Sequence, residues 1–263
     1  MKIKEHEISQ ESEVQINLIV NDFENSQHVV IECTVPKYGR SRDNGTHYCL
    51  NVDNQKIISV KLAFNFTAEI IQWELFMSTI RQILLVPHYK IAKKHGFPIP
   101  GWEDKDYMMI EKGPIGHRKN LGEPDAQESI RNNKKDFLKY LGKTTAMNFL
   151  FGISDRSMLN HVWDMNEKSL YSIDHEILAN NDEEVPSTIK DQILNLLMGK
   201  GWYDNQELRD TFTESFNETW QAADCNQATI ISNFTDYGLQ QYSTLFLERL
   251  RKGPQWVLQR IMS

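Results

Sequence analysis

The first part of the chain alternates between apolar and polar residues with a period near two. The clearest stretches are residues 14–20 and 29–35, and such alternation is typical of half-buried strands. Residues 48–52 and 57–63 continue the pattern on either side of a polar turn at 53–55. We therefore predict four strands, of which the last two form a hairpin.

Helical spacing of apolar residues replaces this alternation further along. The spacing predicts a helix over residues 67–84, whereas the apolar run at 107–111 predicts a buried strand. From about residue 124 the chain is mostly helical, with one helix predicted over residues 130–141 and another beginning at 144. A further helix carries a four-residue repeat of large apolar side chains, which we expect to be core: Leu208, Phe212, Phe216 and Trp220.

These elements predict an α+β fold with two lobes. The N-terminal lobe, over residues 1–112, is expected to be β-rich with one helix. The C-terminal lobe, over residues 113–263, is expected to be helical. Clefts between such lobes are common ligand sites, so we expect a ligand there.

Composition narrows the class of protein. The chain has 263 residues, of which 40% are apolar, and its formal net charge is −7. This balance favours a folded protein and disfavours broad nucleic-acid binding, which needs clustered Lys and Arg. We find no apolar run long enough to span a membrane and no signal peptide, so we expect a cytoplasmic protein without membrane insertion. Cys33, Cys49 and Cys225 lie far apart in the sequence and are expected to be free thiols.

Candidate chemistry concentrates between residues 152 and 176. Asp155 and Asn160 are five residues apart, and Asp174 follows a short apolar strand. A hairpin turning at residues 166–168 would bring Asn160 and Asp174 side by side. Carboxylate and amide oxygens are suitable Mg²⁺ ligands, so the sequence predicts a metal site at the open end of this hairpin.

Upstream residues could supply the charges that bind phosphate. Lys61 lies in an apolar strand, and the helix that follows carries Glu69 and Glu74. In phosphoryl-transfer sites a strand lysine contacts phosphate and a helix glutamate orients that lysine. The two glutamates should lie on different helix faces, so one of them is expected to pair with Lys61; we favour Glu69. The polar loop from Tyr38 to Gly45 contains arginines that could contact phosphate.

The order of these motifs resembles the atypical kinases of the phosphatidylinositol 3-/4-kinase-like superfamily, including HipA-like protein kinases. The resemblance covers about residues 36–180 and is strongest where the chain reads Asp155-Arg-x-x-x-Asn160 and then Ile173-Asp174-His175. It implies a kinase-like fold that binds ATP and Mg²⁺ and phosphorylates an alcohol group. A protein Ser/Thr residue is the acceptor that we favour.

The resemblance also implies a role for each matched residue. Asp155 would be the catalytic base or substrate-positioning carboxylate, and Asn160 and Asp174 would hold Mg²⁺. Lys61 would contact the ATP phosphates, with Glu69 orienting it, and the loop from Tyr38 to Gly45 would cover them. The hinge strand beside adenine would consist of Met109, Ile110, Glu111 and Lys112.

Two departures from the family pattern leave alternatives open. Ser157 and Glu176 stand where relatives carry His and Gly. The chain could therefore be a non-catalytic nucleotide-binding module, and a lipid or small-molecule acceptor is a further alternative. His161 and His175 with nearby carboxylates could instead form the site of a metal-dependent hydrolase. That third interpretation is disfavoured, because neighbouring residues of a strand point to opposite faces.

Overall fold

The computed structural model describes residues 13–21, 28–36, 46–51, 56–62, 68–95, 104, 106–114, 118–153, 158–172 and 182–263. The fold is of mixed α and β type, and the chain divides into two compact units. The first unit comprises Met1–Ile71 and Tyr89–Ile115, and the second comprises Gln72–His88 and Gly116–Ser263. Most of the helix after the fourth strand thus belongs to the second unit, whereas the predicted N-terminal lobe ran unbroken to residue 112.

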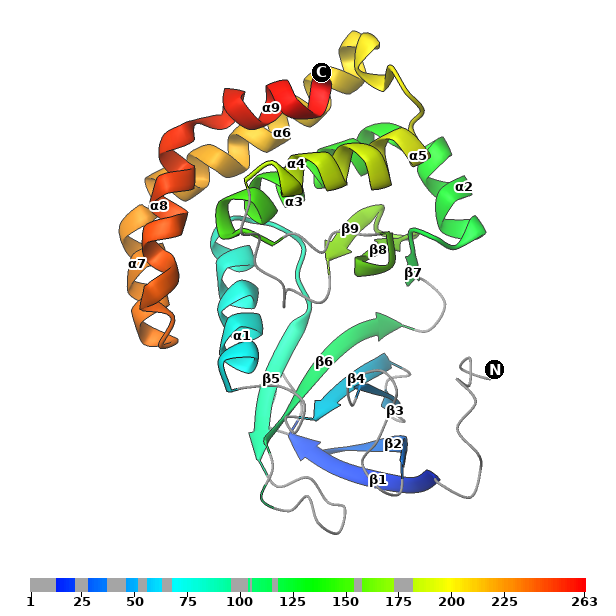
Figure 1. Ribbon diagram of the computed structural model, residues 1–263. Helices are drawn as coiled ribbons and strands as arrows, with labels where there is room; N and C mark the ends of the chain where they lie inside the picture. Colours follow the sequence, from blue (N-terminus) through cyan, green and yellow to red (C-terminus); the bar gives the residue numbers. More distant parts are fainter. Residues whose placement is uncertain are drawn as a thin grey trace. The chain divides into compact units, whose positions relative to one another are not determined.

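The described part of the first unit is built on one antiparallel sheet of six strands (Figure 1), in the order β1-β2-β3-β4-β6-β5. The strands are β1 (Glu13–Asn21), β2 (His28–Pro36), β3 (Thr46–Asn51), β4 (Lys56–Leu62), β5 (Lys90–His95) and β6 (Asp106–Pro114). The alternating stretches of the sequence therefore do form strands, as predicted. β3 and β4 form the expected hairpin, in which Thr46 pairs with Lys61 and Asn51 with Lys56.

The first helix, α1 (Ala68–Ile83), confirms the prediction to within one residue at each end. Its buried side chains include Trp73, Phe76 and Ile80, which recur at helical spacing and face the core of the second unit. In the last turn of the helix, the buried Arg81 donates a hydrogen bond of 2.8 Å to the carbonyl oxygen of Pro87. This bond fixes the turn that leads out of α1.

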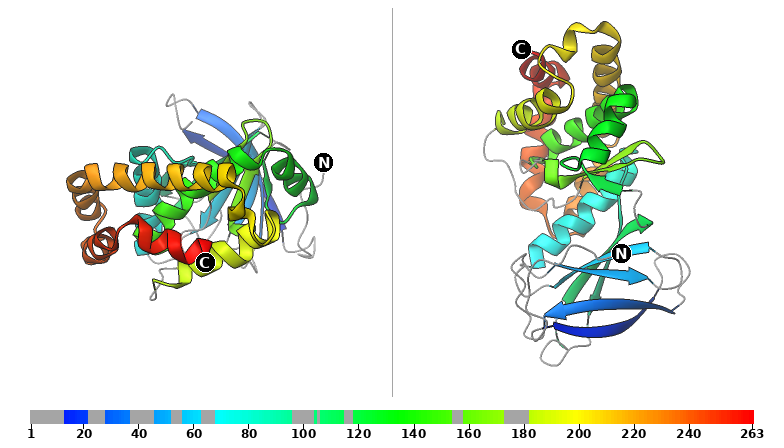
Figure 2. Two further views of the ribbon diagram at one scale, coloured as in Figure 1. Left: turned by 90° about the horizontal axis from the view of Figure 1, so that it is seen from above. Right: turned by 90° about the vertical axis from the view of Figure 1, so that its right-hand side faces the viewer.

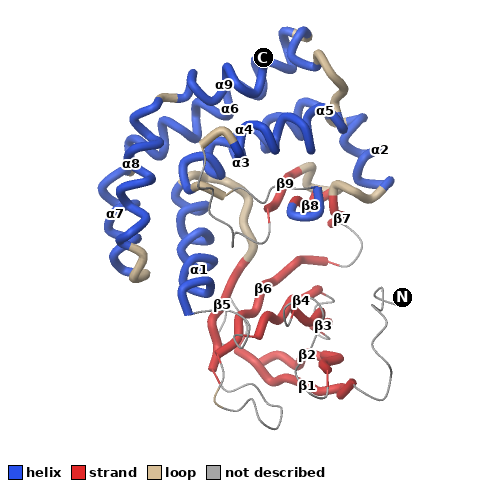
Figure 3. The backbone as a smooth tube through the Cα atoms, in the orientation of Figure 1, coloured by secondary structure: helices blue, strands red, loops and turns tan. Residues whose placement is uncertain are grey.

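The second unit consists mainly of helices, shown in blue in Figure 3, with a small sheet β7-β8-β9. Its strands are β7 (Arg118–Asn120), β8 (His161–Asp164) and β9 (Ser169–Ser172). Its further α-helices are α2 (Pro124–Asn132), α3 (Lys134–Phe151), α4 (Glu184–Thr188), α5 (Asn195–Leu197), α6 (Gln206–Cys225), α7 (Gln227–Asp236), α8 (Ser243–Lys252) and α9 (Pro254–Met262). Short helices of other types are η2 (Met158–Asn160), η3 (Ile189–Leu194), η4 (Trp202–Asp204) and η5 (Gln240–Tyr242).

The helix predictions around residue 140 were wrong. The chain breaks at Asn133, where the backbone leaves helical geometry and the side-chain amide donates to the carbonyl oxygen of Ser129 at 2.7 Å. α2 therefore ends before this residue, and α3 runs on without interruption past Thr144. Apolar spacing missed the break because residues on both sides of it face the same core.

The two longest helices, α3 and α6, pack against each other in the second unit (Figure 2). A methyl group at Gly142 would overlap the hydroxyl of Ser215 and the carbonyl oxygen of Phe212, so only glycine permits this close approach. Farther along, the rings of Phe149 and Trp220 stack with centroids 5.9 Å apart. The predicted aromatic stripe is thus core. In the described part of the chain, no helix has the length and apolar character needed to cross a bilayer.

Candidate functional site

The predicted hairpin is present at the expected residues. β8 and β9 pair antiparallel from Asp164↔Ser169 at the turn to His161↔Ser172 at the open end. The four residues between the strands form the turn, and Lys168 adopts a positive φ of 50° there. Asn160 closes the short helix η2 directly before β8.

This register determines which residues emerge at the open end of the hairpin. Asn160 precedes the last described pair by one residue, and Asp174 follows it by two. Asn160, the described one of the two predicted metal ligands, therefore lies at the open end of the hairpin. Asp174 itself and the predicted catalytic Asp155 lie outside the described residues.

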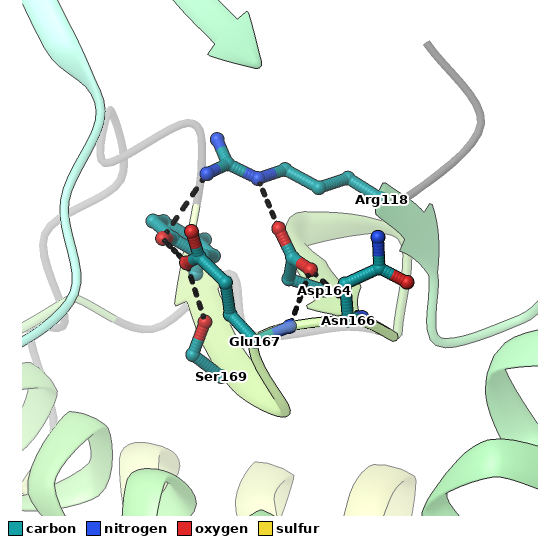
Figure 4. A network of polar contacts seen from close by, with 6 residues as sticks. Arg118, Asp164, Asn166, Glu167 and Ser169 are labelled. Carbon is teal, nitrogen blue, oxygen red and sulfur yellow. Dashed lines mark hydrogen bonds and ion pairs between the residues drawn. The ribbon is translucent and has the colours of Figure 1, made fainter. Parts of the chain in front are cut away.

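A network of polar side chains holds the opposite end of the hairpin together (Figure 4). Asp164, which is 2% exposed, accepts a hydrogen bond from Nε of Arg118 at 2.8 Å. Its other oxygen accepts the backbone N–H groups of Asn166 and Glu167 at 3.0 and 2.9 Å. Arg118 also donates to the hydroxyl of Tyr171 at 3.1 Å. Asp164 therefore stabilises the turn through its N–H groups and links the turn to β7 through Arg118, so it has a structural role in the hairpin.

Replacing Asp164 by alanine is expected to destabilise the second unit by about 1.5–3 kcal/mol, because three hydrogen bonds to one buried carboxylate are lost. Urea denaturation followed by tryptophan fluorescence measures this loss. Asp164→Asn should cost less, because the amide oxygen still accepts the turn N–H groups. Glu207→Ala serves as the control, because Glu207 pairs with Lys135 on the surface and such pairs contribute less than about 1 kcal/mol. Equal stability losses in the two alanine variants would contradict this account.

The predicted phosphate-binding and adenine-binding residues lie on neighbouring strands of the first unit. Lys61 in β4 pairs with Met108 in β6, and the next pair is Val60 with Met109. The predicted hinge residues 109–112 therefore run beside the lysine strand, and after β6 the chain returns to the second unit at Gly116. The predicted phosphate loop, residues 38–45, lies outside the described residues.

The two candidate glutamates of α1 lie in different surroundings, as their spacing predicts. Glu69 is exposed in the first turn, whereas Glu74 is 2% exposed. Both engage in polar interactions. The side chain with which each glutamate would pair is not thereby determined, so the expectation that Glu69 orients Lys61 stays a prediction.

One buried arginine, which was not among the residues predicted from sequence, contacts the two described residues that flank the predicted site segment. Arg249 of α8 is 1% exposed, and its Nε donates to Oδ1 of Asp182 at 2.8 Å. Its guanidinium also lies against Gly152, where a methyl group would overlap Nη1 and lie 2.9 Å from Cζ. Gly152 ends α3 in the left-handed conformation with a φ of 72°. Gly152 and Asp182, which flank the predicted site residues in the sequence, therefore both contact one guanidinium.

Asp182 is held as a carboxylate by this arrangement. Burial raises its pKa, but hydrogen bonds from Lys252 and Arg249 outweigh burial, so the pKa lies below its usual value. A lowered pKa in the folded state means that the pair contributes stability above the unfolded pKa of about 3.9. This contribution is lost as the pH falls through the folded pKa. At neutral pH Asp182 is therefore ionised, and its ion pairs with Arg249 and Lys252 are formed.

The residues of the hydrolase alternative do not gather in the described part of the chain. His161 is completely buried in β8, and Asp164 is engaged with Arg118 and the turn. Among the described residues, no group of three His, Cys, Asp or Glu side chains is arranged to hold a metal ion. His175 lies outside them.

No family model matches the chain, and no curated protein matches it. The chain is similar to a solved structure of the Helicobacter pylori proinflammatory kinase CtkA, with 12% identity over 85% of this chain and 93% of that chain and a TM-score of 0.49. It is also similar to a structure of the FAT and kinase domain of CtTel1, with 11% identity, a TM-score of 0.41 and coverage of 93% of this chain but 21% of that chain. The solved structures that the chain resembles thus include kinases.

Proposed function

We propose that the chain is an ATP- and Mg²⁺-dependent phosphotransferase of the phosphatidylinositol-kinase-like or HipA-like type, with a protein Ser/Thr residue as acceptor. The observation that carries the proposal is the β8–β9 hairpin. In the sequence, Asn160 directly precedes this hairpin and Asp174 follows it by two residues, and the two lie five and nineteen residues after Asp155. An aspartate that accepts the proton, followed in the sequence by two oxygen ligands for Mg²⁺, is the set of residues that kinases use for phosphoryl transfer, and this supports the proposal.

In this proposal each residue acts by position and charge. Asn160 and Asp174 hold Mg²⁺, which neutralises phosphate charge when it is bound. Asp155 orients the acceptor hydroxyl and accepts its proton. Lys61 contacts the phosphates from β4, Glu69 or Glu74 orients it, and the neighbouring residues 109–112 of β6 border the adenine.

Intact-mass spectrometry of the protein incubated with Mg-ATP, alone and with a cell extract, tests the proposal. Addition of phosphoryl groups to the protein or to extract proteins is expected, and chelation of Mg²⁺ should prevent it. Labelling of lipids or small molecules in place of proteins would change the acceptor but retain the reaction.

A second candidate function follows from Ser157 and Glu176, which depart from the family pattern. A non-catalytic nucleotide-binding module predicts that Mg-ATP raises the melting temperature without any phosphoryl transfer or ATP turnover. Tight Mn²⁺ or Zn²⁺ binding in the absence of nucleotide would instead favour a metal-dependent hydrolase. Failure of Mg-ATP to bind at all would overturn both nucleotide proposals.

A further inference from the structure

Two of the three cysteines lie directly opposite each other in the sheet of the first unit. Cys33 of β2 pairs with Cys49 of β3 in the antiparallel ladder, where it continues the pairs Ile31↔Asn51 and Glu32↔Leu50. The sequence separates the two residues by the loop that connects the strands, so only the register brings them together. The third cysteine, Cys225, is an exposed free thiol on α6 in the second unit.

The spacing of such a pair suits a disulfide bond. Opposite residues of an antiparallel ladder have Cα atoms about 4.5–5.5 Å apart. Disulfide bonds join Cα atoms about 4.4–6.8 Å apart. The Cα spacing expected for Cys33 and Cys49 in this ladder therefore lies within the range that disulfide bonds span. Cys225 lies in α6, outside the sheet.

We propose that Cys33 and Cys49 are a site of reversible oxidation that forms a cross-strand disulfide between β2 and β3. The oxidant class is a small disulfide such as glutathione disulfide. One thiolate attacks the oxidant and releases one glutathione thiol, and the second cysteine then displaces the other glutathione. The net reaction converts two protein thiols and one glutathione disulfide into one protein disulfide and two glutathione thiols.

The bond would enclose the connection between β2 and β3. This connection contains residues 38–45, the segment assigned to the ATP phosphates, so a role in regulating that site rests on the proposed function. The disulfide itself does not rest on it. Disulfides that form in reducing compartments are usually transient and redox-sensing, which agrees with a reversible bond at this position.

The test uses the full chain carrying Cys225→Ser, so that only the two candidate thiols remain. The protein is treated with glutathione disulfide, unfolded, alkylated with a maleimide and analysed by mass spectrometry and peptide mapping. We expect loss of both alkylatable thiols, no retained glutathione, and a linked peptide containing Cys33 and Cys49. Dithiothreitol should restore both thiols.

The matched control adds Cys33→Ser to this variant. Because Cys49 then lacks its resolving partner, it should retain either glutathione or an alkylatable thiol. Two free thiols in the parent variant after oxidation, or a separate glutathione on each cysteine, would overturn the proposal. Phosphotransferase activity is not part of this measurement, so a failure of the proposed function would leave its result unchanged.

Discussion

Replacing Asp155 by asparagine is expected to slow ATP-dependent phosphoryl transfer by roughly 10²- to 10⁴-fold, the range typical of a lost proton-accepting group. Replacing Asp174 by asparagine is expected to slow the transfer because it weakens the Mg²⁺ site. The amide has nearly the shape of the carboxylate but cannot accept a proton and carries no charge. Asp155→Asn should therefore lower kcat with little change in the KM for ATP. Asp174→Asn should also raise the Mg²⁺ concentration needed for half-maximal activity, because a cation ligand is weakened.

The control for these variants is Asp191→Asn, which removes an equal charge from an exposed position in η3. Its activity should equal that of the unmodified chain. Thermal unfolding of all three variants separates a catalytic effect from loss of fold. Undiminished transfer in both site variants would be incompatible with the proposed mechanism, whereas loss in only one would assign the reaction to that residue.

Replacing Gly152 by alanine is expected to destabilise the second unit by at least about 2 kcal/mol. The left-handed conformation alone costs a residue with a side chain about 1–2 kcal/mol. The added methyl group would also overlap the buried guanidinium of Arg249, and overpacking of this kind costs a further 1–3 kcal/mol, roughly. Arg249 cannot move aside without disturbing its ion pair with Asp182.

Gly199 provides a matched control for this substitution. Its φ of 85° is also left-handed, but a methyl group there would meet no atom within 4 Å. Gly199→Ala should therefore show only the backbone cost. Urea denaturation can be followed by fluorescence, because Trp163 and Trp220 both lie in the second unit. Equal losses of unfolding free energy in the two variants would show that the contact with Arg249 does not affect stability.

Local pattern was sufficient to predict much of the fold. Period-two alternation located β1 to β4, and helical spacing located α1, because side chains repeat their direction every two residues in a strand and every 3.6 residues in a helix. The break at Asn133 was not predictable in this way. It depends on a side-chain hydrogen bond to Ser129 and leaves the apolar spacing undisturbed.

For the candidate site, sequence predicted the hairpin and its turn because both follow from neighbouring residues. Spacing also predicted that Glu69 and Glu74 face different ways, but it could not tell which is buried, since burial depends on how α1 packs. Arg249 was not predicted because its partners, Gly152 and Asp182, lie far from it in the sequence. The residues next to it are typical of an ordinary charged helix.

The cysteines illustrate the same limit. Distance along the chain indicated three unrelated thiols, yet strand register places Cys33 opposite Cys49. Register is determined by the whole sheet and by the connection between the strands. Residues that meet only through register can be identified from a single sequence only after the strands have been aligned.

The contacts of Arg249 also bear on how the protein is made. Arg249 and Asp182 are 67 residues apart in the sequence, and Gly152 lies still farther upstream. Because synthesis proceeds from the N-terminus, residues 153–181 leave the ribosome well before α8 does. Contacts of such long sequence separation form only after a large loop has closed. The nascent chain can therefore build its sheet and hairpin early, whereas the contacts of Arg249 with Gly152 and Asp182 form only after α8 has emerged.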